Sequence, residues 1–202
     1  NMGWNARLSE HIGTFKAELL EAHAAYVMQD DTKLAALSSA CTMIGLSLPE
    51  RHPYPRLYEL FLAFLSDLKH SERWLESYVR LELDLLAETG FGLDLSCCAS
   101  TGTTDDLVYV SPKSGRAVSR EAGKPYKEKL LKLPGFLLPL SREAEVKTLP
   151  LEGGGEIMNG LALTGYFLER WLLTPHNRKM PAARGRLLEK AHSTLYKAAE
   201  ML

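Results

Sequence analysis

The segment from Ser71 to Gly90 carries apolar residues on two stripes at helical spacing. One stripe contains Trp74, Tyr78, Leu81 and Leu85, and the second contains Leu75, Val79, Leu83 and Leu86. Ser71 can cap the start of such a helix, and Gly90 suits the position just past its end. A helix that is apolar on so much of its circumference has to be surrounded by other helices. The segment therefore predicts a helical bundle with this helix at its centre.

Four other segments have the apolar spacing of amphipathic helices and supply the surrounding shell. Residues 30–32 can cap the first of them, and Pro55 suits the first position of the second. Their expected buried faces are Leu34, Leu37, Cys41, Ile44 and Leu48, and then Leu57, Leu60, Phe61, Phe64 and Leu68. The other two cover residues 157–173 and the residues after Pro181, with Leu161, Thr164, Leu168 and Trp171 and with Leu187, Leu188, Ala191 and Leu195 facing inward. We expect a mainly α-helical chain with Cys41 in its core.

Residues 4–19 alternate apolar and polar side chains as strands do. Trp4, Ala6 and Leu8 fall on one face, and Phe15, Ala17 and Leu19 follow a turn near residues 11–13. This pattern predicts a β-hairpin. A lone two-stranded hairpin is marginally stable in water. Two interpretations follow: a hairpin that lies on the helical body, or the end of a β-domain whose earlier strands are absent from this sequence.

Residues 94–123 carry the spacing of a zinc ribbon with only one of its four ligands. Such a site reads Cys-x2-Cys, about 15–20 other residues and a second Cys-x2-Cys, and the four positions here hold Cys98, Thr101, Ser119 and Ala122. No histidine between residues 70 and 176 replaces the missing cysteines. Residues 107–110 and 116–119 flank a Ser-Pro-Lys-Ser-Gly turn. We expect a small zinc-finger-like β-hairpin insert that binds no metal, followed by a short helix over residues 120–133.

The composition is that of an ordinary globular chain. Its 202 residues are 46% hydrophobic and 24% charged. No apolar run reaches the roughly 18 residues that span a bilayer, and no signal peptide is visible. Three cysteines, two of them adjacent, do not make a disulfide framework, so a cytoplasmic location is expected. A net charge of −1 excludes a globally basic nucleic-acid binder and leaves only a local basic patch for that role.

One segment near the C-terminus is such a patch. The sequence between Arg170 and Glu189 contains no acid. Its later cations are Arg178, Lys179, Arg184 and Arg186, and Lys190 lies just beyond. Cations at the start of a helix are unfavourable for the helix dipole, whereas a phosphate there is favoured. The patch is either an ordinary solvated face or a surface that binds phosphates.

Catalytic motifs are absent from the sequence. It contains no Gly-x-Ser-x-Gly, Walker or His-Glu-x-x-His motif. The glycines at 153–155 are flanked by acids that would repel phosphate, so residues 151–156 are expected to form a loop. Asp105 and Asp106 can ligate a hard cation, which keeps a metal-dependent hydrolase or nuclease as one alternative. We expect a protein that is not an enzyme and has no cofactor.

Taken together, four stretches resemble the RecO family of bacterial recombination mediators: residues 57–68, 74–102, 107–123 and 163–187. The most specific part is the Leu- and Glu-rich helix that ends in Gly-Phe-Gly at residues 90–92. In that family an N-terminal OB-fold barrel precedes a helical domain with a zinc-finger-like insert, and members differ in whether the insert has four cysteines. The resemblance implies that residues 1–22 are the terminal hairpin of the OB fold and that residues 23–202 are the helical domain.

The resemblance also implies a function. Members of the family mediate DNA repair and homologous recombination, bind single- and double-stranded DNA, anneal strands, and bind RecR and the acidic, apolar C-terminal tail of the single-stranded-DNA-binding protein SSB. A nucleoid-associated location without membrane contact is expected. The tail would meet Val79, Arg80, Leu83 and Leu86, and DNA would meet Arg178, Lys179, Arg184, Arg186 and Lys190. The alternative is a helical protein-interaction module with no DNA role.

Overall fold

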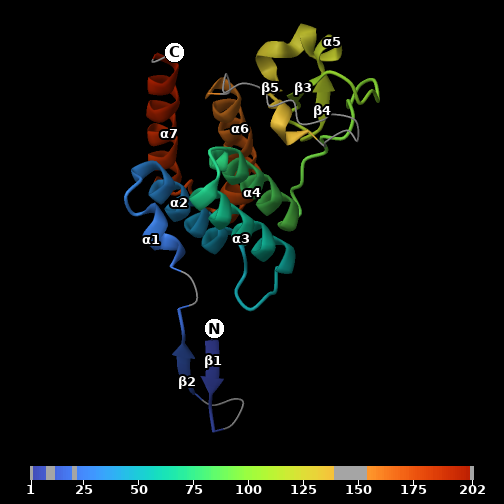
Figure 1. The fold of residues 1–202 in the computed structure, drawn as a ribbon. Helices are drawn as coiled ribbons and strands as arrows, with labels where there is room; N and C mark the ends of the chain where they lie inside the picture. Colours follow the sequence, from blue (N-terminus) through green and yellow to red (C-terminus); the bar gives the residue numbers. More distant parts are fainter. Residues whose placement is uncertain (1, 8–11, 20–21, 139–153, 201–202) are drawn as a thin grey trace.

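The computed structural model describes residues 2–7, 12–19, 22–138 and 154–200. The helices of these segments pack into a bundle, a small sheet lies at one end of it, and a two-stranded hairpin projects away from the helices (Figure 1). The mainly α-helical fold class predicted from the sequence is confirmed. The bundle is therefore the scaffold that carries the insert and the basic segment.

Helix α4, Trp74–Glu88, occupies the centre of the bundle and contacts α2, α3 and α6. Both of its predicted apolar stripes face inward, and Tyr78, Val79 and Leu86 are completely buried. Leu83 is the member of these stripes that remains partly exposed. The prediction of a central helix is confirmed.

Helix α3, Pro55–His70, packs along α4. It begins at the predicted proline and buries Leu57, Phe64 and Leu68. The phenyl ring of Phe64 lies 5.9 Å from the ring of Tyr78 in an edge-to-face arrangement. A short helix that the sequence did not predict, α1 or His23–Val27, contacts both α2 and α3.

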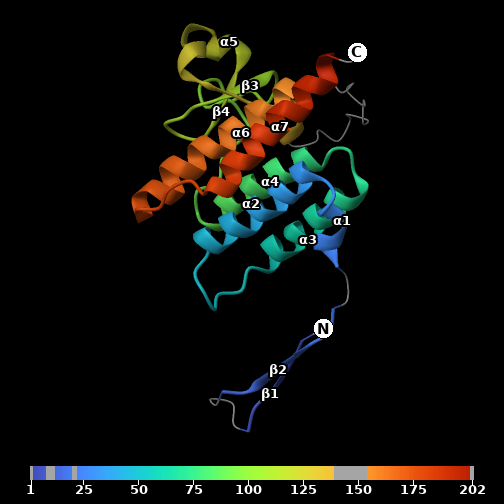
Figure 2. The same ribbon diagram turned by 90° about the vertical axis from the view of Figure 1, so that its left-hand side faces the viewer.

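Helix α2, Asp31–Ser47, shows an error in the predicted face. Asp30 caps it as expected, since its carboxylate accepts the backbone N–H groups of Thr32 and Lys33. The buried face consists of Ala35, Ala36, Ser39, Ala40 and Met43. Small side chains face inward because α2 lies directly against α7 (Figure 2), where close approach leaves little space. Cys41 is therefore exposed and does not lie in the core.

Helix α6, Gly154–Phe167, continues into a π-helical turn at Leu168–Leu173 and a 3-10 turn at Thr174–His176. The predicted helix over 157–173 is correct in position but changes geometry at Leu168. The predicted loop over 151–156 is wrong from Gly154 onward, and its residues 151–153 lie outside the described part of the chain. Helix α7, Ala182–Glu200, then returns along α2 and α6.

The insert supplies two strands of a three-stranded antiparallel sheet. Strand β3, Leu107–Val110, pairs with β4, Ala117–Ser119, as predicted. Its other edge pairs with β5, Leu131–Lys132, inside the stretch that was predicted as a helix. That stretch is helical only as α5, Arg120–Gly123, and the 3-10 helix Lys124–Lys129, and a second 3-10 turn follows at Gly135–Leu137.

The insert touches the bundle through a glycine. Gly115, in the turn between β3 and β4, has a positive φ of 66°. A Cβ atom added there would stand 2.7 Å from the indole ring of Trp171 in the π-helical turn. Both the backbone conformation and the close approach of Trp171 thus require glycine at this position.

The N-terminal hairpin is present as predicted. Strands β1, Met2–Asn5, and β2, Thr14–Ala17, pair antiparallel with Trp4 opposite Phe15. The two rings lie 5.1 Å apart and both remain more than half exposed. The predicted strand residue Leu8 lies outside the described residues. The hairpin stands away from the helices in both views (Figures 1 and 2), so it does not lie on the helical body. Its place in an OB fold stays a prediction.

Candidate functional site

The turn between α6 and α7 presents the first cations of the basic segment. Asn177 has a left-handed φ of 54°, a conformation that asparagine accepts more readily than most residues. The turn is fixed by the backbone N–H of Arg178, which donates to the carbonyl oxygen of Leu173 at 2.9 Å. The side chains of Arg178 and Lys179 are exposed. Neither forms an ion pair with any residue in the described part of the chain.

Two further cations lie on one face of α7. Arg186 and Lys190 are four residues apart, which places them on adjacent turns. Arg186 is exposed and has no ion-pair partner among the described residues. Lys190 is bonded to Asp31 at the start of α2, with 3.0 Å between the Nζ and Oδ2 atoms. An exposed pair of this kind contributes little stability, but it partly neutralises Lys190.

The prediction that Arg184 contacts DNA is wrong for this structure. Its side chain is only 3% exposed. The guanidinium donates from Nε to Oε1 of Glu82 at 2.7 Å and from Nη2 to Oε2 at 2.9 Å. It also donates to the carbonyl oxygen of Leu161 at 2.7 Å. Arg184 therefore lies inside the bundle, where a phosphate cannot reach it.

Glu82 is the centre of a buried polar network that joins four helices. Besides Arg184 of α7, it accepts hydrogen bonds from Tyr78 on its own helix and from Thr164 of α6. The hydroxyl of Tyr78 is in turn 2.7 Å from that of Ser39 on α2. Every polar side chain of the network has a partner, which is the condition under which buried charge is tolerated.

The electrostatics of the network follow from this geometry. Burial alone would lower the pKa of Arg184, but the attraction and hydrogen bonds of Glu82 outweigh it and hold the pKa above its ordinary value. Burial, reinforced by the negative charge of Glu82, raises the pKa of Tyr78 well above its usual value. The arginine and the tyrosine thus keep their protons at neutral pH. Sequence reasoning missed this network, although Glu82, an acid on a helix with two apolar stripes, had to reach either solvent or a partner.

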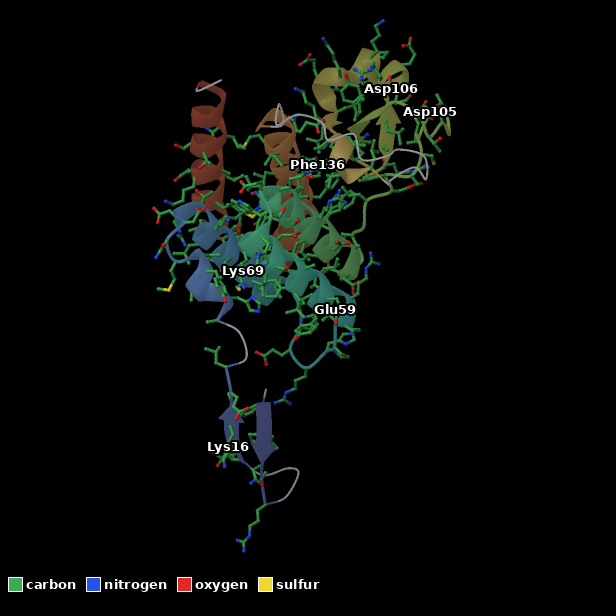
Figure 3. All side chains as sticks on the ribbon, in the orientation of Figure 1. Lys16, Glu59, Lys69, Asp105, Asp106 and Phe136 are labelled. Carbon is green, nitrogen blue, oxygen red and sulfur yellow. The ribbon has the colours of Figure 1, made fainter. Side chains whose placement is uncertain are left out.

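The surface of α4 retains half of the predicted peptide site. Val79 and Leu86 are completely buried, so they do not line a surface notch and this part of the prediction is wrong. Arg80 is exposed and Leu83 is partly exposed. The Arg80 guanidinium donates to the backbone carbonyl of Phe136 and lies 6.0 Å from the centre of its ring. Figure 3 shows Phe136 beside α6, on the side of the bundle that faces the insert.

Three of the zinc-ribbon positions in the insert lie close together. The thiol of Cys98 is almost completely buried and accepts the backbone N–H of Ser119 at 3.3 Å. Burial tends to raise its pKa, but hydrogen bonds from the side chains of Ser119 and Thr101 and from the backbone of Ser119 and Ser100 lower it to about 6. Three of the four ribbon positions therefore meet through hydrogen bonds to one sulfur atom.

The acids of the insert do not form a metal site in the described residues. Asp106 accepts hydrogen bonds from Arg120, with 2.9 Å between Oδ2 and Nε. Figure 3 shows Asp105 and Asp106 on the outer side of the insert. Across residues 2–7, 12–19, 22–138 and 154–200, no three His, Cys, Asp or Glu side chains gather as metal ligands do.

No described helix combines the length and apolar character that crossing a membrane requires. No solved structure matches the chain. Its similarities are with protein families and curated relatives.

The C-terminal family of recombination protein O matches residues 28–180. DNA repair protein RecO of Rhodospirillum centenum is 48% identical over 196 residues, which cover 95% of this chain and 74% of that protein. The RecO proteins of Rhodospirillum rubrum and of a Jannaschia species are 45% and 46% identical, over 93% and 92% of this chain and 73% and 72% of their own lengths. The chain belongs to the RecO family of DNA repair and recombination proteins.

Proposed function

We propose that this protein is a non-enzymatic mediator of recombination. It binds single- and double-stranded DNA, anneals complementary strands, and docks with RecR on single strands coated by SSB, in the cytoplasm and at the nucleoid. The observation that carries the proposal is the set of exposed cations, Arg178, Lys179 and Arg186, that have no ion-pair partner among the described residues of a RecO family member.

Unpaired exposed cations favour a polyanion as their ligand. An ion pair within the protein would have to be broken before a phosphate could bind, whereas Arg178, Lys179 and Arg186 carry no such cost. Each phosphate contact releases condensed counterions from DNA, so the affinity depends on salt and not on base sequence. Lys190 joins this surface with its charge reduced by Asp31.

The docking of SSB is proposed for the remaining surface of α4. Arg80 offers a guanidinium to the carboxylates of the tail, and Leu83 and the ring of Phe136 offer apolar contact beside it. A cation next to an apolar notch suits a peptide that is both acidic and apolar.

The DNA role is tested by the triple substitution Arg178→Ala, Lys179→Ala and Arg186→Ala. We expect weaker binding to oligonucleotides of any sequence, and a log–log salt slope that is shallower by about 0.9 for each lost duplex phosphate contact. Fluorescence anisotropy at several salt concentrations measures both quantities.

The matched control is Arg73→Ala. Arg73 is an exposed arginine that is already bonded to Glu76 at 2.7 Å, so its loss should leave the slope unchanged. An identical slope for the triple variant and the wild type would show that the basic segment is an ordinary solvated face. It would favour the alternative of a helical interaction module without a DNA role.

A further inference from the structure

A pocket opens beside the turn that carries the unpaired cations. It has a volume of about 310 Å³ and lies between the end of α2 and the π-helical end of α6. Its apolar walls are Leu46, Leu48, Pro49, Leu172 and Leu173, and its polar groups are Ser47, His176 and Arg178. None of the described residues that line it is a carboxylate. The lining of the pocket is thus mostly apolar, and it includes the positive charge of Arg178.

Two polar groups line the pocket, one behind its surface and one open to a ligand. The hydroxyl oxygen of Ser47 is shielded from solvent and has no hydrogen-bond partner among the described residues. His176 holds the carbonyl oxygen of Leu172 through Nδ1 at 2.6 Å. That bond fixes the proton of the neutral ring on Nδ1 and leaves Nε2 as an acceptor. A ligand that enters therefore meets the imidazole nitrogen.

The charge around the pocket extends beyond it. Arg178 lines the pocket, Lys179 follows it directly, and neither is paired with a described residue. A ligand with a single negative group would need only one of these cations. A polymer in which flat apolar groups alternate with negative groups can use both features. One flat group enters the pocket, and the negative groups beside it bind the cations.

We propose that the pocket receives one base of single-stranded DNA while Arg178 and Lys179 bind the phosphates on either side of it. This inference rests on the proposed DNA role and adds a preference to it. Apolar side chains accept the faces of an extruded base, and His176 lies where its edge can form a hydrogen bond. The bases of a duplex are paired and stacked inside it, so a duplex uses only the cations. The pocket thus gives the basic segment a preference for single strands.

The first experiment uses the unmodified protein. A single-stranded oligonucleotide is compared with an abasic strand of the same length and charge. Binding of the base-bearing strand should be about tenfold tighter, the effect expected for one stacked base. A 2-aminopurine base in the strand should also become more fluorescent on binding as it leaves the stack.

The second experiment fills the pocket. Ser47→Leu and Leu46→Trp place larger side chains in its lining, and Ser38→Leu is the matched control at an exposed position of the same helix. Both pocket variants should lose the preference for the base-bearing strand and keep duplex binding, while the control keeps both. Thermal melting shows whether each variant is folded.

The outcomes separate this inference from the proposed function. Equal binding of base-bearing and abasic strands by the wild type overturns the pocket and retains the DNA role. Absence of binding to either strand overturns both. Pocket variants that lose an acidic SSB-tail peptide, but bind single strands normally, would assign the pocket to a peptide and overturn the proposal.

Discussion

Cys98 carries an unusual thiol, because four hydrogen bonds favour its ionised form although it is shielded from solvent. In a zinc ribbon the same position would be held as a thiolate by the metal. Here hydroxyl and backbone donors at Ser119 and neighbouring positions take over part of that task. A ribbon frame without four cysteines can therefore keep its shape, since the interactions converge on the one sulfur atom that remains.

The pH dependence of stability should report this thiol. Its pKa is about 6 in the folded chain and 9.0 in an ordinary environment. A depressed folded-state pKa adds stability in full above the unfolded value, and this contribution is lost as the pH falls toward the folded value. The free energy of unfolding should rise from about pH 6 to pH 9, and Cys98→Ala should flatten that rise. Urea unfolding at a series of pH values measures it.

Cys97→Ala is the control for removal of a neighbouring thiol, and it should keep the rise of the wild type. Parallel profiles for Cys98→Ala and the wild type would show that the buried thiol stays neutral. The convergence of the ribbon positions would then be a matter of packing alone.

At the scale of helices, substitutions in the buried ion pair of Glu82 and Arg184 should lower the free energy of unfolding more than other substitutions do. Glu82→Gln leaves a buried guanidinium without its counter-charge, and Arg184→Met leaves a buried carboxylate. Each should destabilise the fold by about 3–5 kcal/mol. The double variant Glu82→Leu with Arg184→Met should recover much of that loss, because an apolar pair of similar volume needs no compensation. Chemical denaturation of the three variants gives the comparison.

A loss below about 1 kcal/mol in either single variant would contradict a buried, desolvated pair. Leu57→Val on α3 serves as a reference for an ordinary core change, which typically costs about 1 kcal/mol. Salt provides an independent check, since a buried pair is screened much less than an exposed one.

The sequence predicts these helices unevenly, for physical reasons. Large apolar residues at regular spacing gave the correct faces of α3 and α4, because such side chains are rarely left exposed in runs. The buried face of α2 was missed because alanine and serine are weak apolar signals, although they are the residues that permit close helix packing. Strand β5 was missed because its two residues are defined only by a distant partner, β3.

The residues of the candidate sites also divide into those that local sequence predicts correctly and those that depend on distant contacts. Arg178 and Arg186 are exposed, as expected for a segment without acids. Arg184 has the same sequence context, and its burial depends on Glu82, which is 102 positions away in the chain. Val79 was assigned to the peptide site from the resemblance to the RecO family, but it faces α6 at Gly160. Contacts between distant elements decide such cases.

At the scale of the whole molecule, the proposed peptide and DNA surfaces lie on different elements, and they should be separable by mutation. Leu83→Asp places a carboxylate where an acidic tail would dock, so it should weaken binding of a labelled SSB-tail peptide by more than about tenfold. It should leave the affinity for DNA and its salt slope unchanged. Peptide anisotropy and DNA anisotropy on the same preparation test both parts.

Leu34→Asp is the control, because Leu34 is a leucine of α2 that is 40% exposed. Melting curves of both variants guard against unfolding, since Leu83 is partly buried. A folded Leu83→Asp variant that binds the peptide normally would remove the docking site from this face of α4.

The buried ion pair between α4 and α7 affects how the chain folds while it is being synthesised. Helix α4 leaves the ribosome long before Arg184 has been translated, since 102 positions separate that residue from Glu82. During this interval the nascent chain carries an unneutralised acid on its central helix, and the small-residue face of α2 is uncovered. Contacts between such distant parts form late in folding. The polar network around Glu82 can therefore close only when α7 emerges, and until then the growing chain exposes unfinished surface of the kind that chaperones shield.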